Sequence, residues 1–362
     1  MSVVNSKRLD EEIPRINHER LLGYYQESID TFCKKLQTYP NTDILIESFR
    51  HFFSKPGKLN RPILFLSTLQ ALQPRVVFNA PWYRFALSLE LFHNFSLIHD
   101  DLIDQSDSRR GQWSLHRYLE NKFQIDVRRA ENLALVMGDV LYGYSISLLT
   151  KIPCAPEKML QAIRYYSDIS LETGLGESLE LLYQTTPLEK ISEHEIKEVT
   201  YLKTTSYSIE APIYLGFLLS DEEASVEGWL SPYARSLGMA FQLENDLHEV
   251  RLLKNPEATH LYDFAQGVRT LYLKKLSEKS TFEERKNIQK TLDEALDPRS
   301  LFDQSLLEKM ELEIEILYQE ASNQLGVLSE RAPNLKTMLD ALIVFLKVNR
   351  RHSEQQYSLH YQ

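Results

Sequence analysis

The chain has 362 residues, of which 43% are hydrophobic and 25% charged, an ordinary globular balance that can bury a sizeable core. Its formal net charge is -10, which argues against general binding to nucleic acid or to an anionic membrane surface. The only cysteines, Cys33 and Cys154, are far apart in the sequence. We therefore expect neither a disulfide framework nor a zinc site, and we interpret the chain as a cytoplasmic protein.

The N-terminal segment, 1–20, carries many charges and lacks the apolar core of a signal peptide, so we expect a tail there. We count no stretch with the roughly 18 apolar residues that a membrane span needs, and expect no transmembrane segment. Apolar residues recur three and four apart, as in Leu307, Met310 and Ile314. These patterns predict one all-α domain over 21–351, followed by a C-terminal tail over 352–362.

Leu89 to His116 is the most informative segment and reads LELFHNFSLIHDDLIDQSDSRRGQWSLH. It begins as a helix with an apolar side, and spacings of three and four then place Asp100, Asp101 and Asp104 on one face. Three carboxylates so close repel one another unless a hard cation lies between them, and oxygen ligands suit Mg²⁺. The ordinary alternative is a solvated acidic helix end.

Two arginines follow these aspartates in a polar loop. Arg109 and Arg110 precede Gly111 directly. Beside a carboxylate–metal cluster they suit a diphosphate, because the metal neutralises its inner oxygens while the guanidinium groups bind the outer ones. Simple charge pairing with the aspartates explains the arginines equally well.

A second acidic segment, Phe241 to Glu249, reads FQLENDLHE. One helix could present Asn245, Asp246 and Glu249 as oxygen ligands, with Gln242 a turn earlier as a hydrogen-bond donor. Acidic helix faces are usually only solvated, so this segment alone decides nothing.

Three further segments carry positive charge. The first, GKLNRP, contains Lys58 and Arg61 and leads into an apolar helix. The second is Lys203-Thr204, in a helix-like stretch with apolar neighbours, and the third is Arg269, which follows Gly267. A single basic side chain is usually solvated, so none of the three indicates a function by itself.

Together these segments, from about Gly57 to Arg351, resemble the trans-isoprenyl diphosphate synthases, which include farnesyl and geranylgeranyl diphosphate synthases. DDLIDQSDSRRG matches the family's first aspartate-rich motif, and GKLNRP resembles its loop for isopentenyl diphosphate. The resemblance implies an all-α isoprenoid synthase-type helical bundle around a central cavity, usually a homodimer. It also implies a Mg²⁺-assisted ionisation of an allylic diphosphate, followed by attack of the isopentenyl double bond.

The resemblance also implies roles for individual residues. Isopentenyl diphosphate would be held by Lys58, Arg61, His93 and Arg110. The allylic diphosphate and its Mg²⁺ ions would be held by Asp100, Asp104, Arg109, Lys203 and Gln242. Thr204 and Gln242 would steady the developing cation. Phe95 and Ser96 lie five and four residues before Asp100, and an aromatic Phe95 would end the product near fifteen to twenty carbons; ordinary core packing is the alternative.

The chain departs from the family's pattern in its allylic half. Asn245 opens a motif that reads DDxxD in the family, and a GQxxD element appears as Gly176-Glu177-Ser178-Leu179-Glu180. Two expected lysines are missing, with Thr259 and Val268 near their places, and Arg269 is a candidate substitute for one of them.

Three functions remain open at this point. The first is a short-chain prenyltransferase that takes an allylic diphosphate and isopentenyl diphosphate. The second is a terpene synthase on the same scaffold, which Asn245 favours. The third is a catalytically weak subunit of a heteromeric synthase, against which the intact first motif argues.

Overall fold

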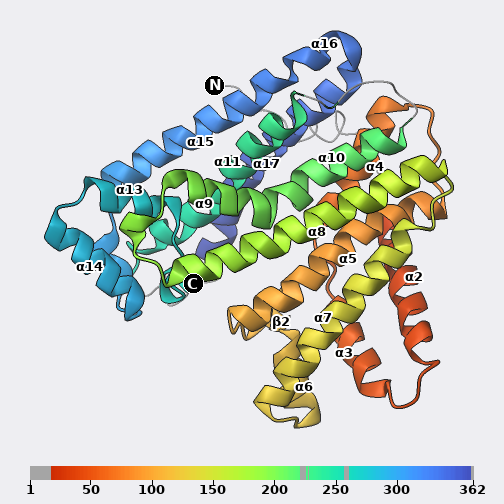
Figure 1. The fold of residues 1–362 in the computed structure, drawn as a ribbon, viewed down its shortest axis with the longest axis horizontal. Coiled ribbons are helices and arrows are strands. Elements are labelled where there is room, and N and C mark those ends of the chain that lie inside the picture. Colours follow the sequence, from red (N-terminus) through yellow and green to blue (C-terminus); the bar gives the residue numbers. More distant parts are fainter. Residues whose placement is uncertain (1–17, 221–225, 227, 257–260, 360–362) are drawn as a thin grey trace. The chain divides into compact units, whose positions relative to one another are not determined.

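The computed structural model describes residues 18–220, 226, 228–256 and 261–359 (Figure 1). The expected N-terminal tail, 1–20, therefore lies almost wholly outside the described residues. Contacts between Cα atoms group the chain into two compact units, Pro14–Arg164 with Leu215–Asp221, and Tyr165–Tyr214 with Glu222–Gln362. We call them the N-terminal and the C-terminal unit and describe each by itself. The single domain expected over 21–351 stays a prediction.

The N-terminal unit is helical apart from one short hairpin. Its elements are α2 (His18–Leu36), α3 (Asp43–Phe53), α4 (Asn60–Leu72), α5 (Ala80–Ile103), β1 (Ser108–Arg109), β2 (Gln112–Trp113), α6 (Leu115–Phe123), α7 (Val127–Leu149), the start of α8 (Pro156–Gln184) and the end of α10 (Ala211–Leu219). Helices α5 and α7 lie side by side (Figure 1). They approach closely at Gly138, where a Cβ atom would come within 2.5 Å of His99 Nε2.

The core of this unit is built largely from aromatic rings. Phe32 packs on Phe49 and Tyr144, with ring centroids 4.9 and 4.6 Å apart, and the Tyr144 hydroxyl donates to the Ser28 carbonyl. Aromatic side chains bury large areas, and a buried hydroxyl needs an acceptor. Helix α2 is thereby fixed to α3 and α7.

Helix α7 bears on the expectation that the chain has no membrane span. Among the described residues it is the helix long and apolar enough to cross a membrane by length and composition, and the expectation of no transmembrane segment stays a prediction. About 44% of the apolar window is buried inside the protein, and Ala134, Met137 and Leu141 lie on its buried side. A core helix of a soluble protein passes the same test, so this is weak evidence for a membrane.

The C-terminal unit is also helical. Its elements are the remainder of α8, η1 (Leu188–Lys190), α9 (Glu193–Thr200), η2 (Tyr201–Glu210), the start of α10, α11 (Leu230–Leu252), α12 (Tyr262–Ala265), α13 (Leu271–Lys279), α14 (Phe282–Asp293), η3 (Pro298–Leu301), α15 (Gln304–Gln324), η4 (Leu325–Val327), α16 (Leu328–Arg331) and α17 (Pro333–Leu359). Helix α17 continues to Leu359, through most of the segment expected as a C-terminal tail. The stripe Leu307, Met310 and Ile314 is buried on α15, which faces α11, as its spacing predicts.

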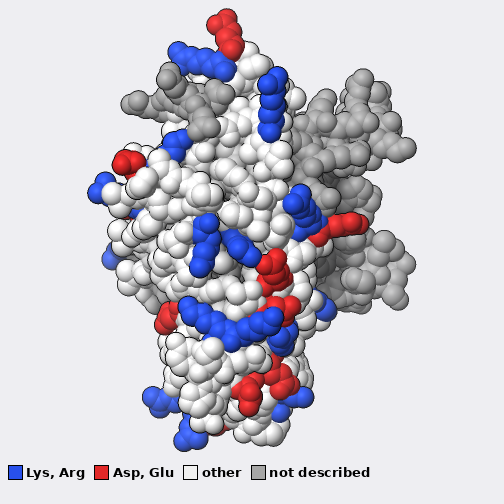
Figure 2. Space-filling model, turned by 90° about the vertical axis from the view of Figure 1, so that its right-hand side faces the viewer, with Lys and Arg blue, Asp and Glu red and all other residues white. Residues whose placement is uncertain are grey.

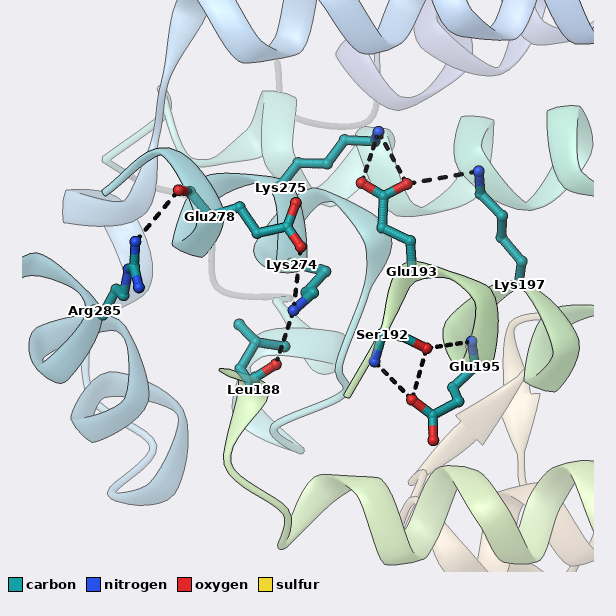
Figure 3. A network of polar contacts seen from close by, with 9 residues as sticks. All are labelled: Leu188, Ser192, Glu193, Glu195, Lys197, Lys274, Lys275, Glu278 and Arg285. Atoms are coloured by element: carbon teal, nitrogen blue, oxygen red, sulfur yellow. Dashed lines mark hydrogen bonds and ion pairs between the residues drawn. The ribbon is translucent and has the colours of Figure 1, made fainter. Parts of the chain in front are cut away.

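Ion pairs fasten α9, α13 and α15 to one another, and Figure 3 shows those between α9 and α13. Glu193 accepts from Lys275 at 3.1 Å and lies 3.6 Å from Lys197, and both lysines also lie within 4 Å of Glu313. Two cations thus alternate with two carboxylates, which is the arrangement in which partly exposed ion pairs contribute most. Beside them, Ser192 and Glu195 form the capping box that starts α9.

Charge on the outside of the molecule is mixed in sign. On the face shown in Figure 2, acidic and basic side chains lie next to one another over its lower part. The expectation, drawn from the net charge of -10, that the chain is no general nucleic-acid binder stays a prediction.

Candidate active site

The first acidic cluster lies at the C-terminal end of α5 in the N-terminal unit. Asp101 is fully buried, whereas Asp100 and Asp104 are partly exposed. Both Arg109 Nε and Arg109 Nη2 lie within hydrogen-bond distance of Asp101 Oδ1, at 2.7 and 2.6 Å. The hairpin therefore folds Arg109 back onto the cluster, and charge pairing, the alternative weighed from the sequence, does occur for this arginine.

The three carboxylates act on one another electrostatically. Burial raises the pKa of Asp101 to about 6; the Arg109 charge opposes this, and the Asp100 and Asp104 carboxylates add to it. Asp101 Oδ2 is buried and has no hydrogen-bond partner among the described residues. An additional cation would reduce the repulsion among the three carboxylates and would give Asp101 Oδ2 a partner.

This donor set fits Mg²⁺, which prefers carboxylate oxygens. In the described part of the chain, no three His, Cys, Asp or Glu side chains already converge as a metal-binding group. Asp100, Asp104 and Asp101 Oδ2 are the oxygens that this cluster could offer the ion, whereas Asp101 Oδ1 is engaged by Arg109. The ligand roles of all three remain predictions.

Ser54 and Lys55, which directly precede the GKLNRP segment, are joined to the hairpin between β1 and β2 by reciprocal hydrogen bonds. Arg110 Nη1 donates to the Lys55 carbonyl at 3.1 Å, and Lys55 Nζ donates to the Gly111 carbonyl at the same distance. Ser54 donates to Gln112 Oε1 at 2.8 Å. The structure thus brings Arg110 against the loop that carries Lys58 and Arg61, two segments about fifty residues apart in the sequence.

Gly57 makes this contact possible. A Cβ atom at that position would lie 2.5 Å from Arg110 Nη2, closer than real Cβ contacts occur. The Arg110 backbone itself is left-handed, with φ of 54°, and Gly111 follows at 68°. Glycine therefore permits the guanidinium to lie directly over the loop.

We expect Gly57→Ala to displace the Arg110 guanidinium at little cost in stability, since the side-chain end is flexible. The dissociation constant for inorganic pyrophosphate, measured by calorimetry, should rise about tenfold because one charge-assisted contact is misplaced. Gly23→Ala is the control, since nothing lies within 4 Å of a Cβ atom there. Unchanged pyrophosphate affinity in Gly57→Ala would mean that Arg110 does not bind the anion.

His93 and a residue that the sequence reasoning missed, Glu90, lie one helical turn apart on α5. Burial lowers the pKa of His93 well below its usual value, and the charges of Arg61, Arg110 and Arg109 lower it further. Glu90 is 2% exposed; burial raises its pKa, while Arg61 and Arg110 oppose that rise. The signal for Glu90 was available as a single carboxylate inside the apolar run LSLELF.

Phe95 and Ser96 lie on α5 between His93 and the aspartates. The Phe95 ring contacts Phe92, His99 and Tyr142, with centroids 5.6, 4.7 and 5.1 Å apart. Ser96 Oγ donates to the His93 carbonyl at 2.9 Å. Phe95 therefore belongs to an aromatic group shared by α5 and α7, and its role in product length remains a prediction.

Lys203 and Thr204 of the C-terminal unit lie on η2, a π-helix of ten residues. Such helices are rare and occur mostly at functional positions. Two glycines let η2 pack closely against α8 and α11. A Cβ atom at Gly176 of α8 would lie 2.5 Å from the Lys203 backbone nitrogen, and one at Gly238 of α11 would lie 2.1 Å from Thr205 Oγ1. The backbone of Lys203 is thereby fixed directly against α8.

The Lys203 ammonium forms ion pairs with two carboxylates of α8. Its Nζ atom lies 2.9 Å from Glu177 Oε2, and it also donates to Glu180. The side chains of all three residues are about one-fifth exposed. Sequence reasoning found the altered element that contains both glutamates but not their contact with this lysine.

The second acidic motif is divided between surface and interior. Asn245 is exposed, whereas Asp246 is buried and accepts from Gln242 Nε2 at 2.7 Å. Burial raises the pKa of Asp246 well above its usual value, and the Asp263, Glu180 and Glu249 carboxylates add to the rise. Gln242 therefore donates a hydrogen bond to Asp246 within its own helix. The substrate role of Gln242 and the metal-ligand roles of Asn245, Asp246 and Glu249 remain predictions.

Arg269 was a candidate substitute for a missing lysine, and its surroundings contradict that idea. Its side chain is 1% exposed and donates to the Gln184, Thr186 and Gly267 carbonyls and to Asp293. The guanidinium is thus used to fasten the end of α8. Thr259, near the place of the other lysine, lies outside the described residues.

Relatives of known description were found by sequence. The geranylgeranyl diphosphate synthase of Methanosarcina mazei is 29% identical over 219 residues, covering 60% of this chain and 63% of that protein. The farnesyl diphosphate synthase of Haemophilus influenzae is 31% identical over 215 residues, 57% of this chain and 66% of that protein. The chain thus matches less than two thirds of the length of these relatives.

Solved structures show the same fold. A geranylgeranyl pyrophosphate synthase from Corynebacterium glutamicum, complexed with isoprenyl diphosphate and magnesium, superposes with a TM-score of 0.72 at 20% identity, covering 93% of this chain and 98% of that one. A farnesyl diphosphate synthase from T. brucei gives 0.73 at 14% identity, covering 90% and 97%. The expected all-α isoprenoid synthase fold is confirmed.

The sequence model of one protein family, polyprenyl synthetase, matches residues 42–308, which is most of the chain. This match contains the GKLNRP loop, both acidic motifs and Lys203. The chain belongs to the polyprenyl synthetase family of prenyltransferases.

Proposed function

We propose that the protein is a short-chain trans-prenyltransferase that condenses an allylic diphosphate with isopentenyl diphosphate. The observation that carries this proposal is the cationic arrangement of the N-terminal unit. Arg110 lies against Gly57 in the loop that also holds Lys58, and the charges of Arg61 and Arg110 both act on the buried Glu90. Cations gathered in this way favour an anion with several charged oxygens, and a prenyl diphosphate is such an anion.

Each of the two units would contribute residues for a different substrate. In the N-terminal unit, Lys58, Arg61, His93 and Arg110 would hold isopentenyl diphosphate, and Asp100 and Asp104 would hold Mg²⁺. When bound, Mg²⁺ supplies positive charge that stabilises a departing diphosphate. In the C-terminal unit, Lys203 and Gln242 would orient the allylic diphosphate, and Thr204 would steady the developing carbocation.

A terpene synthase on the same scaffold is the second candidate, supported by the C-terminal unit. Asn245 is exposed and neutral where the family has an anion, and Lys203 is paired with Glu177 and Glu180. These changes weaken the allylic half and leave the isopentenyl half intact. A weak subunit of a heteromeric synthase is the third candidate, and the complete first motif argues against it.

Product analysis separates these functions. Purified protein would receive dimethylallyl, geranyl or farnesyl diphosphate with Mg²⁺, with and without isopentenyl diphosphate. The prenyltransferase yields longer diphosphates only when isopentenyl diphosphate is present. A hydrocarbon or alcohol formed from one allylic substrate alone would instead identify a terpene synthase, and no turnover would favour the weak subunit.

We expect Phe95→Ala to lengthen the product by at least one five-carbon unit. The ring fills space beside Tyr142, one to two turns from the Asp100 carboxylate, and its removal would leave room for more of the apolar tail. Chromatography of the dephosphorylated products measures the length. Phe92→Ala, which removes a buried ring one turn away, is the control. An unchanged product from stable Phe95→Ala protein would assign Phe95 to the core.

We also propose a cytoplasmic homodimer. Three apolar side chains of α7, Leu135, Val136 and Val140, are 45%, 54% and 40% exposed, and covering them by a second copy would remove that apolar surface from water. Light scattering of the purified protein measures the mass, which a dimer would place at twice 42.3 kDa.

A further inference from the structure

Two carboxylates of α8 hold the Lys203 ammonium from the same side. Glu177 and Glu180 are three residues apart, so they share one face of the helix. The ammonium lies 2.9 Å from Glu177 and donates a hydrogen bond to Glu180. With side chains only about one-fifth exposed, these pairs are screened less by solvent than surface ion pairs.

The backbone keeps the ammonium near these carboxylates. Gly176, the residue before Glu177, lets the Lys203 backbone nitrogen approach to where a Cβ atom would be 2.5 Å away. The lysine side chain therefore starts directly against the helix that carries both glutamates. Reaching an anion elsewhere means breaking both ion pairs.

The local charge is unfavourable for an anion. One ammonium and two carboxylates sum to a single negative charge, and the Glu180 carboxylate also acts on the buried Asp246. A diphosphate is repelled by this surplus, whereas a divalent cation is attracted. Of the two glutamates, Glu177 occupies the position where the related sequence pattern GQxxD has a neutral glutamine.

We propose that Glu177 is a positioning residue that restrains Lys203 and competes with the allylic diphosphate for its ammonium. The identity of that diphosphate rests on the proposed function. Glu177 acts through Lys203 and touches no reacting atom. The restraint makes binding in the C-terminal unit weak and dependent on the divalent ion, and removal of the Glu177 carboxylate leaves only the ion pair with Glu180 to break.

The test is a binding measurement with an unreactive analogue, farnesyl S-thiolodiphosphate, by calorimetry in Mg²⁺. Glu177→Gln should lower the dissociation constant about tenfold, because the anion then competes with one carboxylate, Glu180, in place of two. Lys203→Met should abolish the gain in the Glu177→Gln background, because the gain needs the ammonium. Glu157→Gln removes one exposed carboxylate elsewhere on α8 and controls for net charge.

Two results would overturn the inference. Weaker analogue binding by Glu177→Gln would mean that Glu177 supports the ligand or its metal. A gain that survives in the double variant with Lys203→Met would be a general charge effect. If the protein condenses the two diphosphates but Glu177→Gln binds the analogue no more tightly, this inference alone is rejected. If Glu177→Gln binds more tightly but the enzyme releases hydrocarbons, the proposed prenyltransferase alone is rejected.

Discussion

Asp100→Ala and Asp104→Ala should each lower turnover by about a thousandfold or more in saturating Mg²⁺, with the fold retained. Both carboxylates are partly exposed at the end of α5, whereas the neighbouring Asp101 is buried and paired with Arg109. Removing either would take away a main anchor of the ion that stabilises the departing diphosphate. A thousandfold loss corresponds to about 4 kcal/mol of transition-state stabilisation.

Steady-state rates with radiolabelled substrates measure this loss, and circular dichroism checks the helical fold. Asp107→Ala is the matched control, because Asp107 lies in the following loop with an 81% exposed side chain paired with Arg117. Wild-type protein should also lose activity in a chelator and recover it with Mg²⁺ or Mn²⁺. Full activity in the chelator would contradict the role assigned to these aspartates.

The sequence was sufficient for the features that depend on local spacing. Leu307, Met310 and Ile314 recur at helical intervals, and α15 buries them because an amphipathic helix must cover its apolar stripe. The aspartates of the first motif reach the end of one helix for the same reason. Residue spacing alone therefore suffices to place short motifs of this kind on helices.

Contacts between distant segments could not be predicted in this way. Lys203 has no local signal for pairing with Glu177, because the two are on different helices that the packing brings together at Gly176. Arg269 looked like a spare cation, yet its guanidinium binds the carbonyls at the end of α8. Residue type and spacing leave such partners undetermined, since they depend on how elements pack.

The contact at Gly57 is a second case in which the sequence alone could not give the physical cause. The sequence indicated that Lys58, Arg61 and Arg110 suit one anion, but only as a consequence of resemblance. The structure supplies a physical cause, since Gly57 leaves space for the Arg110 guanidinium and Lys55 fixes both ends of the contact. Gathering these cations is costly without a compensating charge, and Glu90 provides part of it.

Arg61→Ala should raise the KM for isopentenyl diphosphate by about 10- to 100-fold, while the KM for the allylic diphosphate changes less than threefold. Arg61 lies on the first turn of α4 and, with Arg110, acts on the buried Glu90. A lost hydrogen bond between charged groups costs about 1.5–3 kcal/mol, which gives this range. The KM values would be measured with each substrate varied at a saturating level of the other.

Arg50→Ala is the control, because it removes an exposed arginine of the same unit that is paired with Asp30. An equal rise in both KM values would mean that Arg61 supports the fold or both substrates together. If the wild-type enzyme releases a hydrocarbon and the variant also turns over without isopentenyl diphosphate, the proposed condensation of two diphosphates is rejected. The cations around Gly57 would then serve another anion, and the exposed Asn245, together with the paired Lys203, would be the features that distinguish a terpene synthase from the condensing enzyme.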